Sequence, residues 1–379
     1  RVQDKLDYIN QVIRESITGI RVIRAFGNEE YEEDRAGKAF KNYATDMIKL
    51  NKIFAVLNPT IWLMIGVSVA IIVWVGGVFS MKGSMEIGQI TAVTEYSIIT
   101  LSYLILATTT SVTLPKMKSC LDRIEEVLEI NPEIQDFNIE KKCAKDDCAV
   151  VEFENVSFFY KGAEEPVIRD ISFSCNKGET TAIIGSTGSG KSTIANLILR
   201  LHDIDQGEIR INGVDIRCLS QKELRDTIGY VPQKAFLFSG TIEDNLRMGY
   251  KEATKEDMER ALSISQSKSF VDKLPIGLKS EVSQGGSNFS GGQKQRLSIA
   301  RALIRKVPIY IFDDSFSALD LKTDSALRKS LKENMRDAAK IIIAQRVSTI
   351  MDADQILVLD EGKLVGIGKH IDLMKNCSV

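Results

Sequence analysis

Hydrophobic residues recur at helical spacing through the first fifty positions of the chain. Leu6, Ile9, Ile13, Ile17 and Ile20 lie three or four residues apart with charged residues between them, and a dense acidic stretch follows at 29–34. One apolar stripe on an otherwise polar helix is typical of an amphipathic helix. We therefore expect long amphipathic helices from residue 2 to about residue 52.

Two uncharged stretches follow, and each is long enough to cross a bilayer. No charged residue lies between Lys52 and Lys82, and residues 61–79 are almost wholly apolar. A second stretch, 96–115, is also uncharged. Because a bilayer core needs about 20 apolar residues in a helix, we predict membrane spans at about 53–80 and 87–115, joined by the short outer segment 80–86.

The second predicted span carries many hydroxyl groups. They belong to Thr100, Ser102, Thr108, Thr109, Thr110, Ser111 and Thr113. Such hydroxyls either bond back to their own helix or line a translocation cavity, and both readings stay open here. Glu95 is a candidate for the cavity because an ionisable group is costly to bury in a membrane, although it can also reach the outer segment.

Basic residues flank the two spans on their far sides. They are Lys49 and Lys52 before the first span and Lys116, Lys118 and Arg123 after the second. The positive-inside rule therefore places both far ends in the cytoplasm and predicts a multi-pass protein of the cytoplasmic membrane. The last helix should run on past residue 121 and end near Pro132, because proline disfavours a helical residue before it.

From residue 150 onward, short apolar runs alternate with helical patterns. The runs are 180–184, 309–312, 341–344 and 356–359. Continuous apolar runs of this length are typical of parallel strands that are buried on both faces. We predict an α/β domain over 150–379, preceded by an all-α transmembrane fragment over 1–130 and a polar linker over 131–149.

Composition narrows the class of protein further. The 379 residues are 44% hydrophobic and 26% charged, with 49 Lys+Arg against 51 Asp+Glu, so neither disorder nor a nucleic-acid partner is indicated. The 6 cysteines are widely spread, which favours reduced thiols, and the lone pair Cys143 and Cys148 favours free thiols over a zinc site. The sequence opens at Arg1, without a Met and without the pattern of a signal peptide, so we expect the chain to begin inside a longer gene product.

A phosphate-binding motif lies at the start of the α/β domain. Residues 185–192 read G-S-T-G-S-G-K-S, between an apolar run and a helical pattern. In this context backbone amides and a helix N-terminus surround phosphate oxygens, Lys191 reaches the β- and γ-phosphates, and Ser192 can ligate Mg²⁺. The predicted ATP-binding residues are Gly185, Ser186, Thr187, Gly188, Ser189, Gly190, Lys191, Ser192 and Thr193.

The apolar run 309–312 ends in two carboxylates, Asp313 and Asp314. A carboxylate at the end of a strand beside a phosphate loop can hold the magnesium ion. We therefore predict Asp313 as a second Mg²⁺ ligand beside Ser192, with ATP and Mg²⁺ as the bound cofactors.

Three further motifs lie around these two. They are V-P-Q at 231–233, F-S-G-G-Q at 289–293 before a helical pattern, and S-A-L-D at 317–320. In this order and spacing the chain resembles the ATP-binding cassette (ABC) transporters, and residues 15–26 resemble the cytoplasmic loop and following helix of the exporters. The resemblance covers the whole chain. It implies a P-loop nucleotide-binding domain with a helical subdomain, after the last two of six membrane helices.

The resemblance also implies roles for single residues. Tyr160 would stack on adenine, with a place in the strand core as the alternative, and Gln233 would contact both Mg²⁺ and the attacking water. Asp320 would link the two ATP sites that form when two such domains close head to tail. The residues that would meet the γ-phosphate held by the other subunit are Ser290, Gly291, Gly292 and Gln293.

Two positions depart from the pattern of hydrolytic members of the family. Asp314 stands where those members have Glu, which withdraws the carboxylate by roughly 1.5 Å, and a misplacement of ~1 Å can cost ~100-fold in rate. Gln345 stands where the family has His, so it can donate a hydrogen bond but cannot carry a charge. Both changes predict a site that binds ATP and hydrolyses it poorly.

These observations favour the degenerate-site half of a heterodimeric, multidrug-type exporter, whose partner is a second ABC half-transporter. A self-sufficient homodimeric exporter and a nucleotide-gated regulatory membrane subunit are the alternatives. The two spans argue against a soluble ABC ATPase. The transported substrate stays open among small molecules, peptides and lipids.

Overall fold

The computed structural model describes residues 2–136 and 150–377. Contacts within the chain divide it into two units, residues 1–131 and 132–379. The first unit is all helical, and the second combines helices with three sheets. We call them the membrane unit and the ATPase unit.

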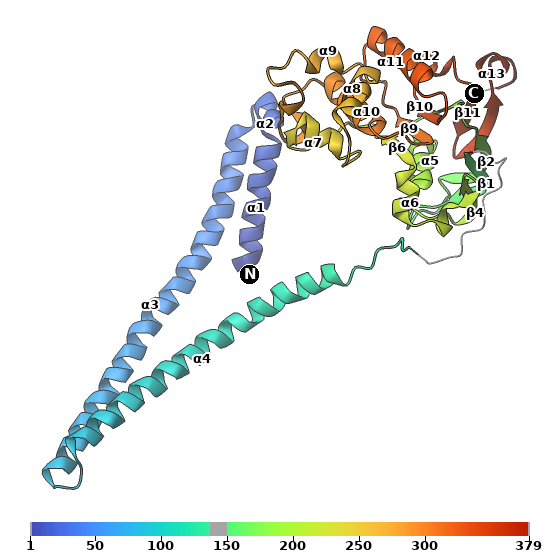
Figure 1. Ribbon diagram of the computed structural model, residues 1–379. Coiled ribbons are helices and arrows are strands. Elements are labelled where there is room, and N and C mark those ends of the chain that lie inside the picture. The colour runs from blue at the N-terminus through green and yellow to red at the C-terminus, as the bar shows by residue number, and fades with distance from the viewer. Residues whose placement is uncertain (1, 137–149, 378–379) are drawn as a thin grey trace. The chain divides into compact units, whose positions relative to one another are not determined.

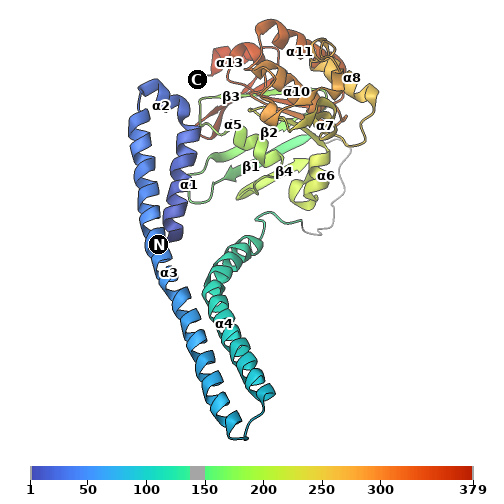
Figure 2. The same ribbon diagram turned by 90° about the vertical axis from the view of Figure 1, so that its left-hand side faces the viewer.

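The membrane unit consists of four helices. They are α1 (Val2–Thr18), α2 (Ile20–Phe26), α3 (Glu29–Met81) and α4 (Ile87–Leu128). Helix α1 lies along the first part of α3, and α3 contacts α4 beyond the turn at 82–86 (Figures 1 and 2). Ile9 and Val12 of α1 and Ala39 of α3 are buried, and Leu6 is half-buried. Ile13, Ile17 and Ile20 of the predicted apolar stripe are exposed, so only the first part of the stripe is a packing face.

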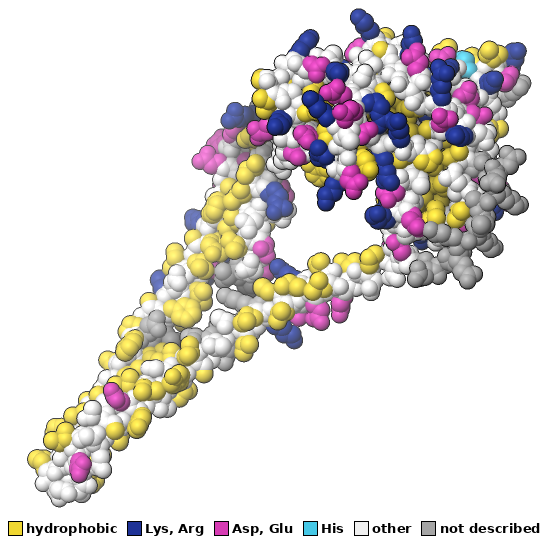
Figure 3. All heavy atoms as spheres, viewed as in Figure 1, with side chains coloured by type: hydrophobic (Ala, Val, Ile, Leu, Met, Phe, Trp, Pro, Cys, Tyr) yellow, Lys and Arg dark blue, Asp and Glu magenta, His cyan; other side chains and the backbone are white. Residues whose placement is uncertain are grey.

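The predicted amphipathic helix and the first predicted span are one continuous helix. α3 runs for 53 residues and contains Pro59 without a break in its assignment. By length and composition, α3 and residues 87–107 of α4 could each cross a membrane. Most apolar side chains of these segments are exposed in the single chain, as the yellow surface along both helices in Figure 3 shows.

The hydroxyls of the second predicted span bond to their own helix where their side chains are described. Thr100, Ser102 and Thr110 donate to the carbonyl four residues earlier, over 2.7–2.9 Å, and Thr113 donates to Thr110 O over 2.8 Å. The side chains of Thr108, Thr109 and Ser111 lie outside the described residues. Glu95 is exposed. Four hydroxyls therefore form hydrogen bonds to their own helix, and a role of this helix in lining a translocation cavity stays a prediction.

The ATPase unit is built on a sheet of six strands in the order β12-β11-β3-β10-β9-β6. Their bounds are β3 (Thr180–Gly185), β6 (Ile228–Val231), β9 (Ile309–Asp313), β10 (Ala339–Ile343), β11 (Gln355–Asp360) and β12 (Lys363–Gly368). All neighbours are parallel except β11 and β12. The four apolar runs of the sequence are β3, β9, β10 and β11, which confirms the predicted parallel strands.

An antiparallel sheet and a set of helices complete the ATPase unit. The sheet has the order β2-β1-β4-β5, and β7 pairs with β8. These strands are β1 (Val151–Phe158), β2 (Ile168–Cys175), β4 (Gln206–Ile211), β5 (Val214–Asp215), β7 (Gly240–Thr241) and β8 (Glu281–Val282). The helices are α5 (Lys191–Ile198), α6 (Gln221–Asp226), α7 (Ile242–Arg247), α8 (Lys255–Ile264), α9 (Lys268–Val271), α10 (Gly291–Leu303), α11 (Leu321–Asn334), α12 (Val347–Ile350) and α13 (His370–Asn376), with 3-10 turns at Ile216–Cys218, Gly277–Lys279 and Gln284–Gly286.

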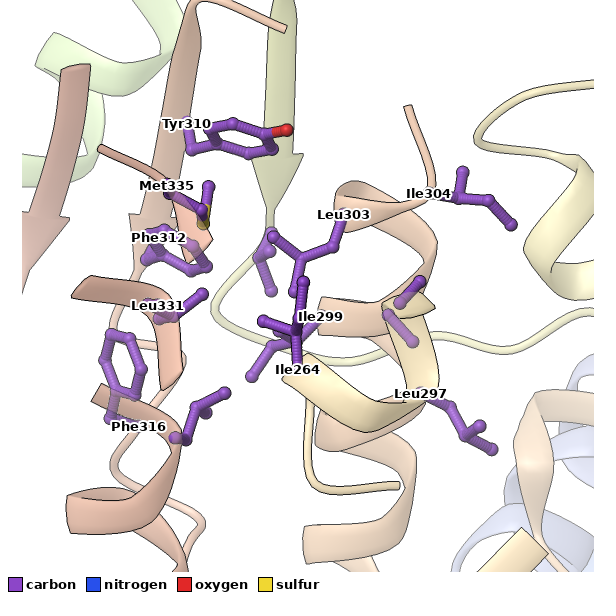
Figure 4. Close-up of a cluster of buried hydrophobic side chains, with 14 of the residues drawn as sticks. Ile264, Leu297, Ile299, Leu303, Ile304, Tyr310, Phe312, Phe316, Leu331 and Met335 are labelled. Carbon is purple, nitrogen blue, oxygen red and sulfur yellow. The ribbon is translucent and has the colours of Figure 1, made fainter. Parts of the chain in front are cut away.

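Two hydrophobic cores lie on the two faces of the large sheet. Successive side chains of β9 alternate between them: Tyr310 and Phe312 join the core with α8, α10 and α11 (Figure 4), whereas Ile309 and Ile311 join the core with α5 and the antiparallel sheet. A strand covered on both faces needs an apolar residue at every position. This explains why the run 309–312 has no polar alternation.

Candidate ATP site

The phosphate loop joins the end of β3 to the start of α5. Gly190 immediately precedes Lys191. It has a φ of 95°, a left-handed backbone conformation that favours glycine. The Lys191 Nζ donates to Gly185 O over 2.8 Å and to Ser186 O over 2.6 Å. Burial lowers the pKa of Lys191, and the nearby charges of Asp314 and Asp313 oppose this shift. The amine therefore lies inside the curl of backbone where phosphate oxygens would bind.

The two predicted metal ligands lie in direct contact. Ser192 Oγ donates to Asp313 Oδ1 over 3.0 Å. Parallel pairing brings them together: Asp313 at the end of β9 lies opposite Ile343 of β10, which lies opposite Ile183 of β3. Burial is the largest cause of a raised pKa at Asp313, and the hydrogen bond from Ser192 partly offsets it.

This pair fits a magnesium ion. Mg²⁺ is usually held by one or two protein oxygens together with substrate phosphates and waters, rather than by a closed protein cage. A hydroxyl and a carboxylate beside the phosphate loop supply such oxygens. Within the described residues no group of three or more His, Cys, Asp or Glu side chains could hold a metal, and Cys143 and Cys148 lie outside them.

Asp314 and Gln233 meet at the same edge of the sheet. The Gln233 Nε2 donates to Asp314 Oδ2 over 3.3 Å. Asp314 has a φ of 44°, and its backbone amide donates to Ile343 O over 2.9 Å. Gln345 follows the end of β10 by two residues and is exposed. The two positions that depart from the hydrolytic pattern thus lie after the neighbouring strands β9 and β10.

Tyr160 lies beside the helix that the phosphate loop begins. Its hydroxyl is 3.3 Å from Thr193 Oγ1, and its ring meets Phe158 and His202 edge-on, with centroids 4.9 Å and 5.3 Å away. Tyr160 is 36% exposed whereas Phe158 is 4% exposed, so Tyr160 is not a core aromatic. No sequence pattern indicates His202, because a single histidine after a helix belongs to no motif. Stacking of Tyr160 on adenine stays a prediction.

The S-G-G-Q motif begins α10 and caps it. Ser290 Oγ accepts from the Gln293 amide over 3.3 Å, and Gln293 Oε1 accepts from the Ser290 amide over 2.9 Å. Ser290 and Gly291 are exposed, and no hydrogen bond among the described residues joins 290–293 to the phosphate loop. The motif is therefore separate from the cluster of Lys191, Asp313 and Asp314.

Asp320 caps α11 in a similar way. Its carboxylate accepts from the Thr323 amide over 3.0 Å, and this hydrogen bond is the largest cause of its lowered pKa. Asp320 is exposed. The cap accounts for Asp320 within one chain, and its role in linking two ATP sites stays a prediction.

Arg296 supports the S-G-G-Q motif and was not predicted from sequence. Its Nη1 donates to Gln266 O over 2.8 Å, its guanidinium lies 4.9 Å from the centre of the Phe270 ring, and its Nε donates to Gly292 O over 3.4 Å. These contacts fix the first turn of α10 against the loop between α8 and α9. One arginine in a helix gives no sequence signal for such a role.

Comparisons with known proteins agree with this architecture. The family model for the ABC transporter matches residues 168–317, and that for the ABC transporter transmembrane region matches residues 1–104. An uncharacterized ABC transporter ATP-binding protein of Mycobacterium tuberculosis is 40% identical over 100% of this chain and 65% of its own length. An ATP-dependent lipid A-core flippase of Desulfotalea psychrophila is 34% identical over 99% of this chain and 65% of its own length.

A solved structure gives the same result. The structure of a bacterial Atm1-family ABC exporter with ATP bound matches 100% of this chain and 67% of that chain, with a TM-score of 0.86 and 30% identity. The chain belongs to the ABC transporter family, and it has the fold of an ABC exporter, a transmembrane helical region followed by a P-loop nucleotide-binding domain. This confirms the predicted fold class. The chain spans 65% of the length of the first of these curated relatives.

Proposed function

We propose that this chain is a subunit of an ATP-dependent exporter in the cytoplasmic membrane, with its ATPase unit in the cytoplasm. The family, the two apolar helices and the exporter fold support this proposal. Relatives that are lipid A-core flippases favour a lipid among the three substrate classes left open by the sequence.

ATP is expected to bind along the edge formed by the ends of β3, β9 and β6. Backbone amides of 185–192 and the amine of Lys191 would hold the phosphates. Ser192 and Asp313 would hold the magnesium ion, which neutralises phosphate charge when bound. Hydrogen bonds to two carbonyls of the loop hold the Lys191 amine close to the position where it would bind a phosphate. To contact a phosphate, the amine has to leave these two acceptors.

We further propose that this chain's own ATP site binds ATP and hydrolyses it slowly. The observation that carries this proposal is the pairing of Asp314 with Gln233. The Asp314 side chain is one methylene shorter than that of Glu, and its carboxylate accepts a hydrogen bond from the Gln233 side-chain amide. A carboxylate in this position is poorly placed to orient a water on the γ-phosphate. Gln345 offers a neutral amide where a charged imidazolium would stabilise the developing charge.

The S-G-G-Q motif would act on ATP held by a second half-transporter. Ser290 and Gly291 are exposed at the start of α10, where backbone amides and the helix N-terminus can meet phosphate oxygens. No hydrogen bond among the described residues joins this motif to its own phosphate loop, which leaves it available for the partner's site. The partner would then supply the hydrolytic Glu and His.

Restoring the two hydrolytic side chains tests the proposal. Asp314→Glu combined with Gln345→His should raise ATP hydrolysis by the purified chain in lipid vesicles, by about 10- to 100-fold if placement of the carboxylate is limiting. Asp352→Glu, the same chemical change at an exposed position outside the site, is the matched control and should change nothing. Fast hydrolysis by the unmodified chain alone would contradict the proposal.

Replacing the serine of the S-G-G-Q motif tests the shared site. Ser290→Ala should abolish ATP hydrolysis by the complex with the partner half-transporter, while binding of ATP to this chain's own site persists. Ser287→Ala, an exposed serine of the same loop, is the control. Unchanged hydrolysis by the complex with Ser290→Ala would show that the motif serves no partner site.

A further inference from the structure

Residues 133–136, shortly after α4, are held on the ATPase unit by polar contacts. Lys161 Nζ pairs with Glu133 Oε1 over 3.1 Å, Gln221 Nε2 donates to Ile134 O over 3.3 Å, Arg200 Nη2 donates to Gln135 O over 3.4 Å, and the Gln221 amide donates to Asp136 Oδ1 over 2.8 Å. We call residues 133–136 together with Lys161, Arg200 and Gln221 the linker clasp. Every residue of this short segment has a partner.

Arg200 is the buried centre of the clasp. It is 1% exposed and lies two residues beyond the end of α5. Its guanidinium is also bound by Asp203 Oδ1 over 2.8 Å and by Leu219 O over 3.2 Å. A buried guanidinium that loses an acceptor pays a large desolvation cost. The carbonyl of Gln135 is therefore held at the far end of the helix whose first turn carries Lys191 and Ser192.

Gln221 is the second anchor. It is the first residue of α6, so its amide has no acceptor within the helix, and the Asp136 carboxylate fills this place. Its side-chain Oε1 accepts from Arg225 Nη2 over 3.1 Å, while its Nε2 holds Ile134 O. The side chain is thus fixed at both ends. The ion pair of Lys161 with Glu133 is exposed and contributes little.

The clasp shortens the connection between α4 and the ATPase unit. From Leu128 at the end of α4 to Glu133 the chain can span at most about 17 Å, whereas from Leu128 to the start of β1 it can span at most about 80 Å. A connecting segment that is several times longer restricts the distance between the two parts that it joins much less. Whether α4 is tightly connected to the ATPase unit therefore depends on whether residues 133–136 stay bound.

We propose that the linker clasp, rather than the chain beyond residue 136, is the mechanical connection between α4 and the ATPase unit. Arg200 and Gln221 are its positioning residues. A displacement of α5 or α6 then reaches the end of α4 through a short segment.

Insertions on either side of the clasp test this proposal. Spin labels at Glu125 of α4 and Lys363 of β12 report the distance between the two units in the full-length protein in lipid nanodiscs. A Gly/Ser insertion of about eight residues after Ile130, before the clasp, should broaden the distance distribution. The same insertion within 138–148 should leave it unchanged. Equal broadening by both insertions, or none by either, would overturn the proposal.

Variants of the clasp provide the second arm. Asp136→Ala with Gln221→Ala removes two contacts without altering buried Arg200, and it should make the insertion within 138–148 broaden the distribution. Glu129→Ala, an acidic residue outside the clasp, is the control. If the insertion within 138–148 remains silent in the double variant, residues 133–136 are not the connection.

The consequence for activity rests on the proposed function. The insertion after Ile130 should lower substrate-stimulated ATP hydrolysis several-fold, while the insertion within 138–148 should keep it within about twofold of the unmodified protein. If the unmodified protein showed no substrate-stimulated hydrolysis, this would contradict the proposed export function but not the proposed clasp. The label distances would still decide whether the clasp connects the units.

Discussion

The two units of this chain use hydrophobic residues in opposite ways. In the ATPase unit, residues such as Phe312, Ile183 and Leu197 are fully buried between helices and sheets. In the membrane unit, Trp62 and Trp74 of α3 are 71% and 77% exposed. On the face shown in Figure 3, charged side chains are spread over the ATPase unit, whereas few lie along α3 and α4 near the turn that joins them.

The difference shows where each unit finds its stability. The ATPase unit removes its apolar surface from water by itself, which stabilises a fold by about 25 cal/mol per Å² buried. The apolar helices find no such cover within one chain, so lipid or other helices have to supply it. Substitutions of apolar residues should therefore have very different effects in the two units.

The largest effect is expected in the core of the ATPase unit. Phe312→Ala empties a site between β9, α10 and α11 and should lower the free energy of unfolding by about 3–5 kcal/mol. Trp74→Ala removes a larger side chain from an exposed position and should change the free energy of unfolding much less. Denaturant unfolding of both variants in detergent micelles measures the difference. Equal losses would show that Trp74 is covered in the intact protein.

A smaller effect is expected where the two apolar helices touch. A Cβ at Gly76 of α3 would lie 2.9–3.2 Å from side-chain atoms of Ile90 in α4. Gly76→Val should therefore force the helices apart and cost about 1–3 kcal/mol, and Ile90→Ala in the same chain should restore part of it. Gly66→Val, where a Cβ meets no atom within 4 Å, is the control. Thermal unfolding of these three variants and of the unmodified protein in micelles tests this packing.

The smallest effect is expected for the dependence of stability and of metal affinity on pH. Burial raises the pKa of Asp313 above its ordinary value of 3.8, so the folded protein binds a proton there more readily than the unfolded chain does. The contribution of Asp313 to stability without metal is therefore present below the ordinary value and is lost as the pH rises through the folded pKa. Affinity for Mg²⁺ has the opposite trend, because a protonated carboxyl is a poor ligand.

Titration calorimetry at several pH values measures this trend. Affinity for Mg²⁺-ATP should fall severalfold as the pH is lowered toward the folded pKa of Asp313. Asp320→Asn should leave the trend unchanged, because the Thr323 amide lowers the pKa of Asp320 and keeps it ionised. An affinity that is independent of pH over this range would show that Asp313 does not ligate the metal.

The sequence by itself determined the local elements and the chemistry of single positions. Apolar residues at every position of 309–312 required a strand covered on both faces, and G-S-T-G-S-G-K-S required a turn of backbone amides before a helix. Uncharged stretches of sufficient length predicted that α3 and α4 cross a membrane. These inferences rest on interactions between near neighbours, so periodicity and motif are enough to find them.

Only the tertiary structure decided which distant residues meet. The motifs predicted Asp313 and Ser192 as ligands of one metal ion, and the parallel pairing of β9, β10 and β3 is how the fold brings them together. No pattern in the sequence indicated the hydrogen bond of Gln233 to Asp314 or the packing of His202 against Tyr160. The same holds for Arg200, whose four acceptor residues come from three separate segments of the chain. A side chain acquires such partners through strand order and helix packing, which depend on the whole fold and leave no mark in the neighbouring sequence.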